Sequence, residues 1–235
     1  MRWAEWIFLF AGNAFLYYYT DSRLSFLLGA FILVVLALYK LGAKWLLENR
    51  FSKYLMLWSF PLAAILSYYV TWNYNPSDIM QFALNFVLEG RLDLGQDALF
   101  TYGFTLFGTP VAWVGNGLDE NGLKGVGIYN WVDCAYIKVM IDYGVTALAL
   151  YLVTMTLLLY RCYRRGELIQ MLVLSMVAAH GIIDDLVLIP IYNTFLILIG
   201  TMLLTANGTG NARKKFSGYW LLILSCSPCK WQFLR

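Results

Sequence analysis

Six apolar runs of roughly membrane-spanning length divide this chain, and they constrain its fold more than any other feature. A transmembrane helix needs roughly 20 predominantly apolar residues, because the hydrocarbon core of a bilayer is about 30 Å thick. Backbone amides inside that core must be hydrogen-bonded within the protein, and runs of this length and apolarity satisfy the requirement as helices. The sequence therefore predicts an all-α, polytopic membrane helix bundle with spans at residues 3–19, 24–39, 54–72, 134–160, 168–183 and 191–206.

Lysine and arginine residues gather at every second boundary between these runs. Short cytoplasmic loops are enriched in these two residue types, so the alternation predicts a multi-pass protein of the cell membrane with both termini in the cytoplasm. The chain 1–235 is then a single membrane domain, with a long outer loop at 73–133 and a cytoplasmic tail at 207–235. The basic residues are Arg2; Lys40, Lys44, Arg50 and Lys53; Arg161, Arg164 and Arg165; and Arg213, Lys214 and Lys215.

The composition excludes several classes of function. Hydrophobic residues make up 60% of the chain and charged residues 13%, so the surface of an ordinary soluble domain cannot be built from it. The net charge of +3 comes from the predicted inner loops and gives no reason to expect a nucleic-acid partner. With one histidine and a lone Cys-x-x-Cys pair at Cys226 and Cys229, the ligands for a zinc site are few. We therefore expect no metal and no cofactor.

The long outer loop carries the most informative local pattern. Ile79, Phe82, Ala83, Phe86 and Val87 recur at helical spacing, which predicts an amphipathic helix lying on the outer mouth of the bundle. The glycine at position 90 is expected to end that helix, which leaves the arginine at position 91 just past its end.

Four short motifs, in order, resemble one family of membrane proteins. The strings resemble the outer loop and flanking spans of the polysaccharide polymerases of Gram-positive capsule and exopolysaccharide clusters, a branch of the superfamily shared with O-antigen ligases. The resemblance covers residues 11 to about 200, and it matches the later half of the family's spans. The motifs are Thr20-Asp21-Ser22-Arg23; Asn85-x-x-Leu88-x-Gly90-Arg91 followed by Tyr102-Gly103-x-Thr105-Leu106-Phe107-Gly108; Val132-Asp133-x-Ala135-Tyr136 with Tyr143-Gly144; and His180-Gly181-Ile182-Ile183-Asp184-Asp185 with Tyr192-Asn193-x-Phe195.

The resemblance implies metal-independent glycosyl transfer at the outer face of the membrane. The substrates it implies are undecaprenyl-diphosphate-linked oligosaccharide repeat units, and the implied partners are the lipid bilayer and the chain-length regulator and flippase of the same pathway. Three alternatives stay open: ligase-like glycan transfer, a truncated or non-catalytic partner of the polysaccharide machinery, and a transporter. A transporter needs polar groups near the bilayer midplane, and the middle parts of these spans are nearly all apolar.

Two arginines are expected at the outer surface, where the orientation rule disfavours positive charge. A guanidinium group fits phosphate oxygens through two parallel hydrogen bonds, so Arg23 and Arg91 are candidate ligands of the diphosphate. The alternative is an ordinary surface ion pair, of Arg23 with Asp21 and of Arg91 with Glu89 or Asp93.

Three acid–base residues complete the candidate site. Asp133 opens the fourth span and is either the helix N-cap or the base that removes the acceptor's proton; ligases of the superfamily carry a histidine at the similar place. His180 and Asp184 are four residues apart, so on a helix they share one face and can act as a base or as a hydroxyl anchor; a buried, hydrogen-bonded histidine is the other interpretation. Lys138 and Asp142 have the same spacing and are predicted to neutralise each other.

Overall fold

The computed structural model describes residues 3–20, 23–115 and 129–185. Within these ranges every regular element is a helix and no β-strand occurs, which confirms the all-α prediction for this part of the chain. All described residues belong to one compact unit. The predicted span at 191–206 and the predicted tail at 207–235 lie outside the described residues.

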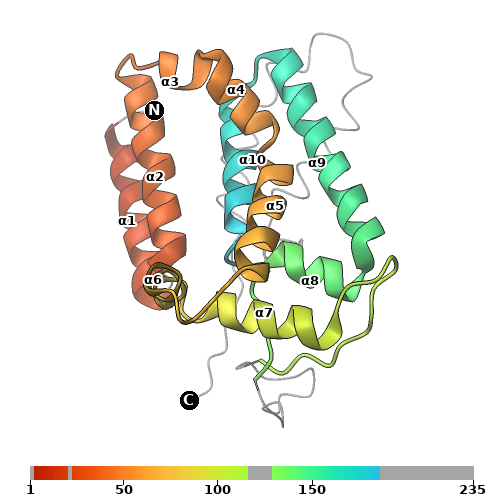
Figure 1. Ribbon diagram of the computed structural model, residues 1–235. Helices are drawn as coiled ribbons and strands as arrows, with labels where there is room; N and C mark the ends of the chain where they lie inside the picture. The colour runs from red at the N-terminus through yellow and green to blue at the C-terminus, as the bar shows by residue number, and fades with distance from the viewer. Residues whose placement is uncertain (1–2, 21–22, 116–128, 186–235) are drawn as a thin grey trace, which may run out of the picture. The chain divides into compact units, whose positions relative to one another are not determined.

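Two antiparallel helices near the N-terminus coincide with the first two predicted spans. Helix α1 covers Trp3–Thr20 and helix α2 covers Arg23–Lys40, and the two pack along each other (Figure 1). The Nδ2 atom of Asn13 on α1 donates a hydrogen bond to the Phe26 carbonyl on α2 at 3.2 Å. A polar side chain in an apolar contact between helices is thereby satisfied, and it ties the pair together.

The third predicted span is a bent pair of helices. After the short helix α3 (Trp45–Glu48), helix α4 covers Arg50–Leu57 and helix α5 covers Ser59–Trp72, and their axes differ by 65°. Pro61 lies in the first turn of α5 and has no N–H to donate to a carbonyl of α4, so a straight helix cannot continue through this point.

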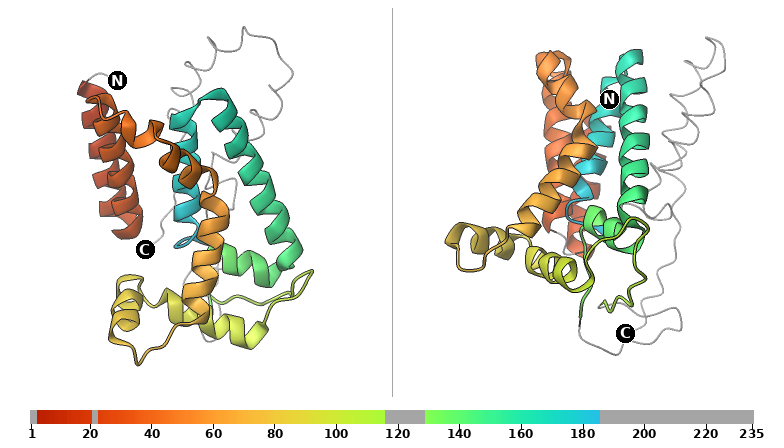
Figure 2. Two further views of the ribbon diagram at one scale, coloured as in Figure 1. Left: turned by 45° about the horizontal axis from the view of Figure 1, so that its top comes forward. Right: turned by 45° about the vertical axis from the view of Figure 1, so that its right-hand side comes forward.

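The predicted outer loop contains two helices that lie across one end of the unit. Helix α6 covers Ile79–Val87 and helix α7 covers Arg91–Tyr102, and Figures 1 and 2 show both at the end where α5 finishes. The carboxylate of Asp78 caps α6 by accepting from the Met80 amide at 2.8 Å. The predicted helix beginning at Ile79 is therefore confirmed, and it ends before Gly90 as expected.

The fourth predicted span, 134–160, is also broken. Helix α8 covers Ala135–Asp142 and lies across the same end as α7, and helix α9, Gly144–Arg165, then runs along the unit (Figure 1). The outer segment that ends at Thr109 packs against the break between α8 and α9. The Thr109 amide donates a hydrogen bond to the Ile141 carbonyl at 2.8 Å. Gly108 and Gly144 both have φ of +86°, and a Cβ on either would collide with the other segment's backbone.

Helix α10, Leu168–His180, completes the core. Most of the most deeply buried side chains come from α5, α8, α9 and α10, and Val132 in the segment before α8 joins them. The Tyr136 hydroxyl on α8 donates to the Ala178 carbonyl on α10 at 2.8 Å, and this bond holds the short helix α8 against α10. The fully buried large residues are Phe60, Val132, Ile137, Ile141, Leu158, Leu159 and Met171.

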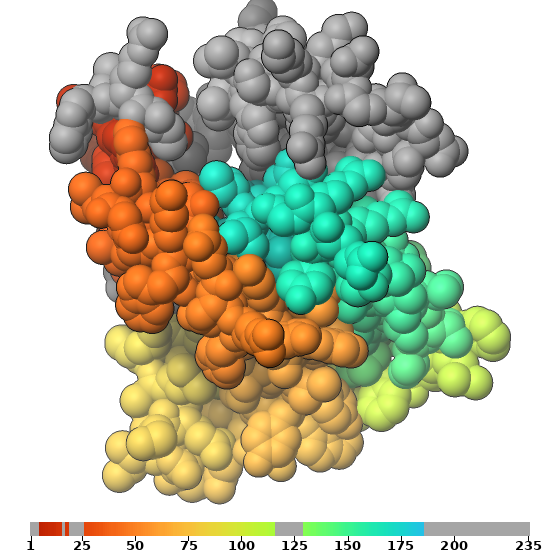
Figure 3. Space-filling view, turned by 90° about the horizontal axis from the view of Figure 1, so that it is seen from above, coloured from red at the N-terminus to blue at the C-terminus, as the bar shows by residue number. Residues whose placement is uncertain are grey.

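One described helix, α9, is long and apolar enough to cross a membrane by itself, and α4 with α5 make a second if the bent pair counts as one span. Five of the six predicted spans coincide with described helices, some of them broken, and the sixth lies outside the described residues, so a bundle of six full-length crossings is not confirmed. The basic residues Lys40, Arg50, Arg164 and Arg165 stand at the ends of α2 and α9 and at the start of α4, which share one end of the unit (Figures 1 and 3). Helices α6, α7 and α8 lie at the opposite end.

Candidate functional site

The first turn of α7 places Arg91 at the end of the unit opposite the basic residues. Glu89 and Gly90 have φ of +56° and +83°, which reverses the chain between α6 and α7. The Oδ1 atom of Asn85 on α6 then accepts from the Leu92 amide at 3.0 Å and lies 3.4 Å from the Asp93 amide. An α6 side chain thus satisfies amides that α7 cannot bond itself, and this fixes the start of the helix.

Arg91 pairs with Asp133, which lies 42 residues later in the chain. Its Nε atom donates to Oδ2 of Asp133 at 2.9 Å, and the two side chains are 24% and 26% exposed. The ion-pair alternative for Arg91 names Glu89 or Asp93 as its partner, and the structural alternative for Asp133 is a helix N-cap. Neither applies: the N-cap residue of α8 is Cys134, with no side-chain bond to the helix.

The guanidinium group of Arg91 keeps most of its donors. Only Nε bonds to another side chain within the part of the chain that the structure describes, so the two terminal nitrogens and their four N–H groups remain for a ligand. The Arg91 side chain is partly exposed, so a ligand can approach it from solvent. The arrangement can therefore bind an anion while Asp133 stays in contact with Nε.

The surroundings of the Asp133 carboxyl group raise its pKa. Its burial raises its pKa above the ordinary value, the Arg91 guanidinium opposes this rise, and the carboxylates of Asp185 and Asp184 add to it. The pKa of the neighbouring Tyr129 hydroxyl is raised too, mainly by burial and then by the charge of Asp133. A carboxylate whose pKa is raised is a stronger base than an ordinary surface aspartate.

A second ion pair, Lys138 with Asp185, lies beside the first and is more buried. Lys138 Nζ on α8 is 2.5 Å from Oδ2 of Asp185, and the side chains are 13% and 7% exposed. The same ammonium group lies 3.2 Å from the centroid of the Trp131 ring. The expected Lys138–Asp142 ion pair does not form; Nε1 of Trp113 instead donates to both carboxylate oxygens of Asp142, at 2.8 and 3.0 Å.

The third pair is the one expected from four-residue spacing. Nε2 of His180 lies 3.3 Å from Oδ2 of Asp184, with 26% and 30% of the side chains exposed. The turn after α10 also reaches the Asp133 segment directly, because the Ala135 amide donates to the Gly181 carbonyl at 2.9 Å. This bond explains how the carboxylates of the turn come close enough to act on Asp133.

Four of the five predicted site residues therefore lie in one polar cluster: Arg91, Asp133, His180 and Asp184. The fifth, Arg23, is the first residue of α2, and its side chain lies outside the described residues. Because α2 begins at the end of the unit where α6 and α7 lie, its backbone stands at the same end as the cluster (Figure 1).

Sequence reasoning missed the role of Asp185. Its need for a cation follows from its burial at 7% exposure, and the spacing of residues in the sequence does not reveal that burial. The contributions of Trp113 and Trp131 had no sequence signal either, because they depend on how the outer loop folds back over α8. Among the described residues, no three His, Cys, Asp or Glu side chains converge in a way that could hold a metal ion.

Comparison of the chain with protein-family models, with curated proteins and with solved structures found no match.

Proposed function

We propose that this chain joins undecaprenyl-diphosphate-linked oligosaccharide repeat units at the outer face of the cytoplasmic membrane, as a polysaccharide polymerase. The observation that carries the proposal is the contact between Arg91 and Asp133. It combines a guanidinium group with open donors and a carboxylate with a raised pKa, which are the two groups that this reaction needs.

The reaction asks little more of the protein. A hydroxyl oxygen of the acceptor sugar attacks the anomeric carbon of the donor, the bond from that carbon to the diphosphate oxygen breaks, and the diphosphate leaves with the electron pair. The hydroxyl proton passes to Asp133, which must be ionised beforehand. The terminal nitrogens of Arg91 offset the charge that grows on the leaving diphosphate.

The charges around the cluster indicate from which side the diphosphate arrives. The carboxylates of Asp142 and Asp185 lie near Lys138, and those of Asp184 and Asp185 lie near Asp133, so the interior of the cluster holds more negative than positive groups. A diphosphate is repelled there and is expected on the open side of Arg91, next to the α6–α7 turn. His180 and Asp184 are then placed to hold sugar hydroxyls rather than phosphate.

The two ends of the unit support the proposed sidedness. Basic residues at the ends of α2 and α9 and the start of α4 share the end opposite α7 and α8. Under the positive-inside rule the basic end faces the cytoplasm, and the cluster faces outward, where lipid-linked repeat units are joined. Arg23 begins α2 at the outward end and is proposed as a second ligand of the diphosphate.

The test is polymer formation in a cell whose surface polysaccharide depends on this chain. Arg91→Gln and Asp133→Asn are each expected to lower polymer by about 100-fold or more, because each removes a group that acts in the transition state. Unpolymerised lipid-linked repeat units are expected to accumulate on the outer leaflet. Arg91→Lys keeps the positive charge but cannot form the two parallel hydrogen bonds of a guanidinium group. Its polymer yield is expected to lie between those of wild type and Arg91→Gln.

The matched control is Arg164→Gln, which removes the same charge from an exposed arginine at the opposite end of the unit. It is expected to leave polymer length unchanged at equal membrane abundance. If both Arg91→Gln and Asp133→Asn are present in the membrane and produce polymer at the wild-type level, this pair has no catalytic role. Repeat units trapped on the inner leaflet point to a transporter instead.

A further inference from the structure

Helix α6 has its polar and apolar faces the wrong way round for a helix in water. No residue of α6 is buried, and its apolar side chains are turned outward: Ile79 is 87% exposed, Met80 82% and Phe86 78%. Its two polar side chains, Gln81 and Asn85, are the partly buried ones. A helix that covers a protein core shows the opposite arrangement.

Both inward polar side chains of α6 make hydrogen bonds. Oε1 of Gln81 accepts from the Asn75 amide at 2.6 Å, and Nδ2 of Asn85 donates to the Tyr74 hydroxyl at 3.0 Å while its Oδ1 caps α7. The orientation of α6 is therefore fixed by three side-chain hydrogen bonds along one face. The helix cannot turn its apolar face inward without breaking them, so the exposure of the apolar face belongs to the folded state.

Lipid is the partner that this face fits. The outward residues of α6 carry no charge, and water exposure of so many apolar groups costs free energy at about 25 cal/mol per Å². The helix lies across the end of the unit, at the level of α7, while α9 runs along it (Figures 1 and 2). A short apolar helix lying at the end of a membrane-spanning helix is at the depth where headgroups meet acyl chains.

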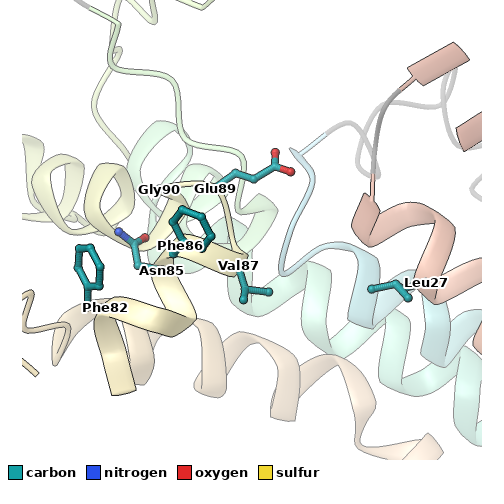
Figure 4. Close-up of a pocket in the computed structure, with 7 residues that line it drawn as sticks. All are labelled: Leu27, Phe82, Asn85, Phe86, Val87, Glu89 and Gly90. Atoms are coloured by element: carbon teal, nitrogen blue, oxygen red, sulfur yellow. The ribbon is translucent and has the colours of Figure 1, made fainter. Parts of the chain in front are cut away.

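The space beside α6 also suits an acyl chain. A cavity of about 600 Å³ lies between α6 and α2 (Figure 4). It is lined by Leu27 on α2, by Phe82, Asn85, Phe86 and Val87 on α6, and by Glu89 and Gly90 in the turn that follows. Leu27 is itself 59% exposed, so both walls offer apolar surface to whatever fills the gap.

We propose that α6 lies in the headgroup–acyl boundary of the bilayer with its outward face against lipid, and that this position fixes the depth of Arg91 relative to the membrane surface. The link to Arg91 is the Asn85 side chain, which joins α6 to the first turn of α7. Arg91 is thereby held at the level of lipid phosphates. This inference stands without the proposed function, because it depends only on the exposed face and its contacts.

Depth measurement by spin labelling tests it. Single cysteines replace Met80 or Phe86 in the full chain, with Cys134, Cys162, Cys226 and Cys229 replaced by alanine or serine, and the labelled protein is placed in bilayer nanodiscs. Power saturation then compares accessibility to oxygen, which concentrates in lipid, with accessibility to a water-soluble nickel chelate. Leu150 on α9, 69% exposed, is the lipid reference, and Asp97 on α7, exposed and charged, is the water reference.

The expected oxygen-to-nickel ratio at positions 80 and 86 is severalfold higher than at Asp97 and close to that at Leu150. A ratio like that at Asp97 overturns the inference, because the face is then in water. Low accessibility to both reagents overturns it as well, because another protein surface then covers α6. Ile79 gives a further labelling site if either replacement prevents folding, and unlabelled protein that elutes as wild type confirms that the cysteine-free chain is intact.

Discussion

The Nε atom of Arg91 lies 2.9 Å from Oδ2 of Asp133, which joins the first turn of α7 to the segment that leads into α8. Of the charges near Asp133, Arg91 is the one that lowers its pKa, against burial and two neighbouring carboxylates that raise it. Arg91→Gln is therefore expected to raise the pKa of Asp133 further. A base works only when ionised, so the acid limb of the pH–activity profile is expected to move to higher pH.

The profile separates this effect from simple loss of diphosphate binding. In Arg91→Gln, residual activity relative to wild type is expected to be lowest in acidic buffer and to recover partly in alkaline buffer. Arg91→Lys retains a positive charge, so its acid limb is expected to lie nearer to wild type. A uniform loss at every pH contradicts the electrostatic role of Arg91, although it leaves a binding role intact.

A second prediction concerns the buried pair of Lys138 and Asp185. Lys138→Met leaves the carboxylate of Asp185 without its cation at 7% exposure, and we expect a loss of about 3–5 kcal/mol in the free energy of unfolding. Adding Asp185→Leu is expected to recover most of that loss, since two apolar side chains then replace the pair. The measurement is thermal unfolding of the full chain in detergent, followed by size-exclusion chromatography.

The control for this pair is Lys44→Met, which removes an exposed lysine at the other end of the unit. It is expected to change stability by less than about 0.5 kcal/mol. If Lys138→Met unfolds no earlier than Lys44→Met, the ammonium group of Lys138 does not neutralise Asp185 in solution.

The sequence located helices well and their breaks poorly, for a physical reason. Apolar runs predict where helices lie because burial or lipid contact needs a continuous apolar surface, and α1, α2 and α10 follow them closely. The break at Gly144 depends on the outer segment at Gly108, which crosses it from another part of the chain. A run of apolar residues contains no sign of such a crossing.

In the candidate site, too, the sequence predicts local contacts but not contacts between distant segments. Four-residue spacing was enough to predict that His180 and Asp184 meet, because the turn after α10 keeps a helical hydrogen bond from the Asp184 amide to the His180 carbonyl at 3.0 Å. The same rule was wrong for Lys138, whose ion-pair partner Asp185 comes from a turn 47 residues away. Spacing predicts which residues can meet along one helix, whereas the packing of α8 against the α10 turn decides which of them do.

The crossing of Gly108 and Gly144 gives a third prediction. Alanine at either position puts a Cβ against backbone atoms of the other segment, at a positive φ that alanine disfavours. Gly108→Ala and Gly144→Ala are each expected to lower the melting temperature and to loosen α8. The decrease in the double variant is expected to be smaller than the sum of the two single decreases, because both substitutions disrupt the same crossing.

The matched control is Gly12→Ala on α1, where an added Cβ meets no atom within 4 Å. Alanine favours helix over glycine by about 1 kcal/mol, so this variant is expected to be as stable as wild type or more so. Equal melting temperatures for Gly108→Ala and Gly12→Ala in detergent contradict the close crossing.

The last prediction concerns Asn85, whose Oδ1 accepts from the Leu92 amide and whose Nδ2 donates to the Tyr74 hydroxyl. Asn85→Ala leaves the first turn of α7 uncapped, and we expect a loss of about 1 kcal/mol with faster hydrogen exchange at Leu92 and Asp93. Asn73→Ala is the control, because that exposed side chain makes one local bond, to the Tyr69 carbonyl. Because α7 begins with Arg91, faster exchange confined to its first turn shows that Asn85 positions this arginine, whereas unchanged exchange there shows that α7 holds Arg91 without help from α6.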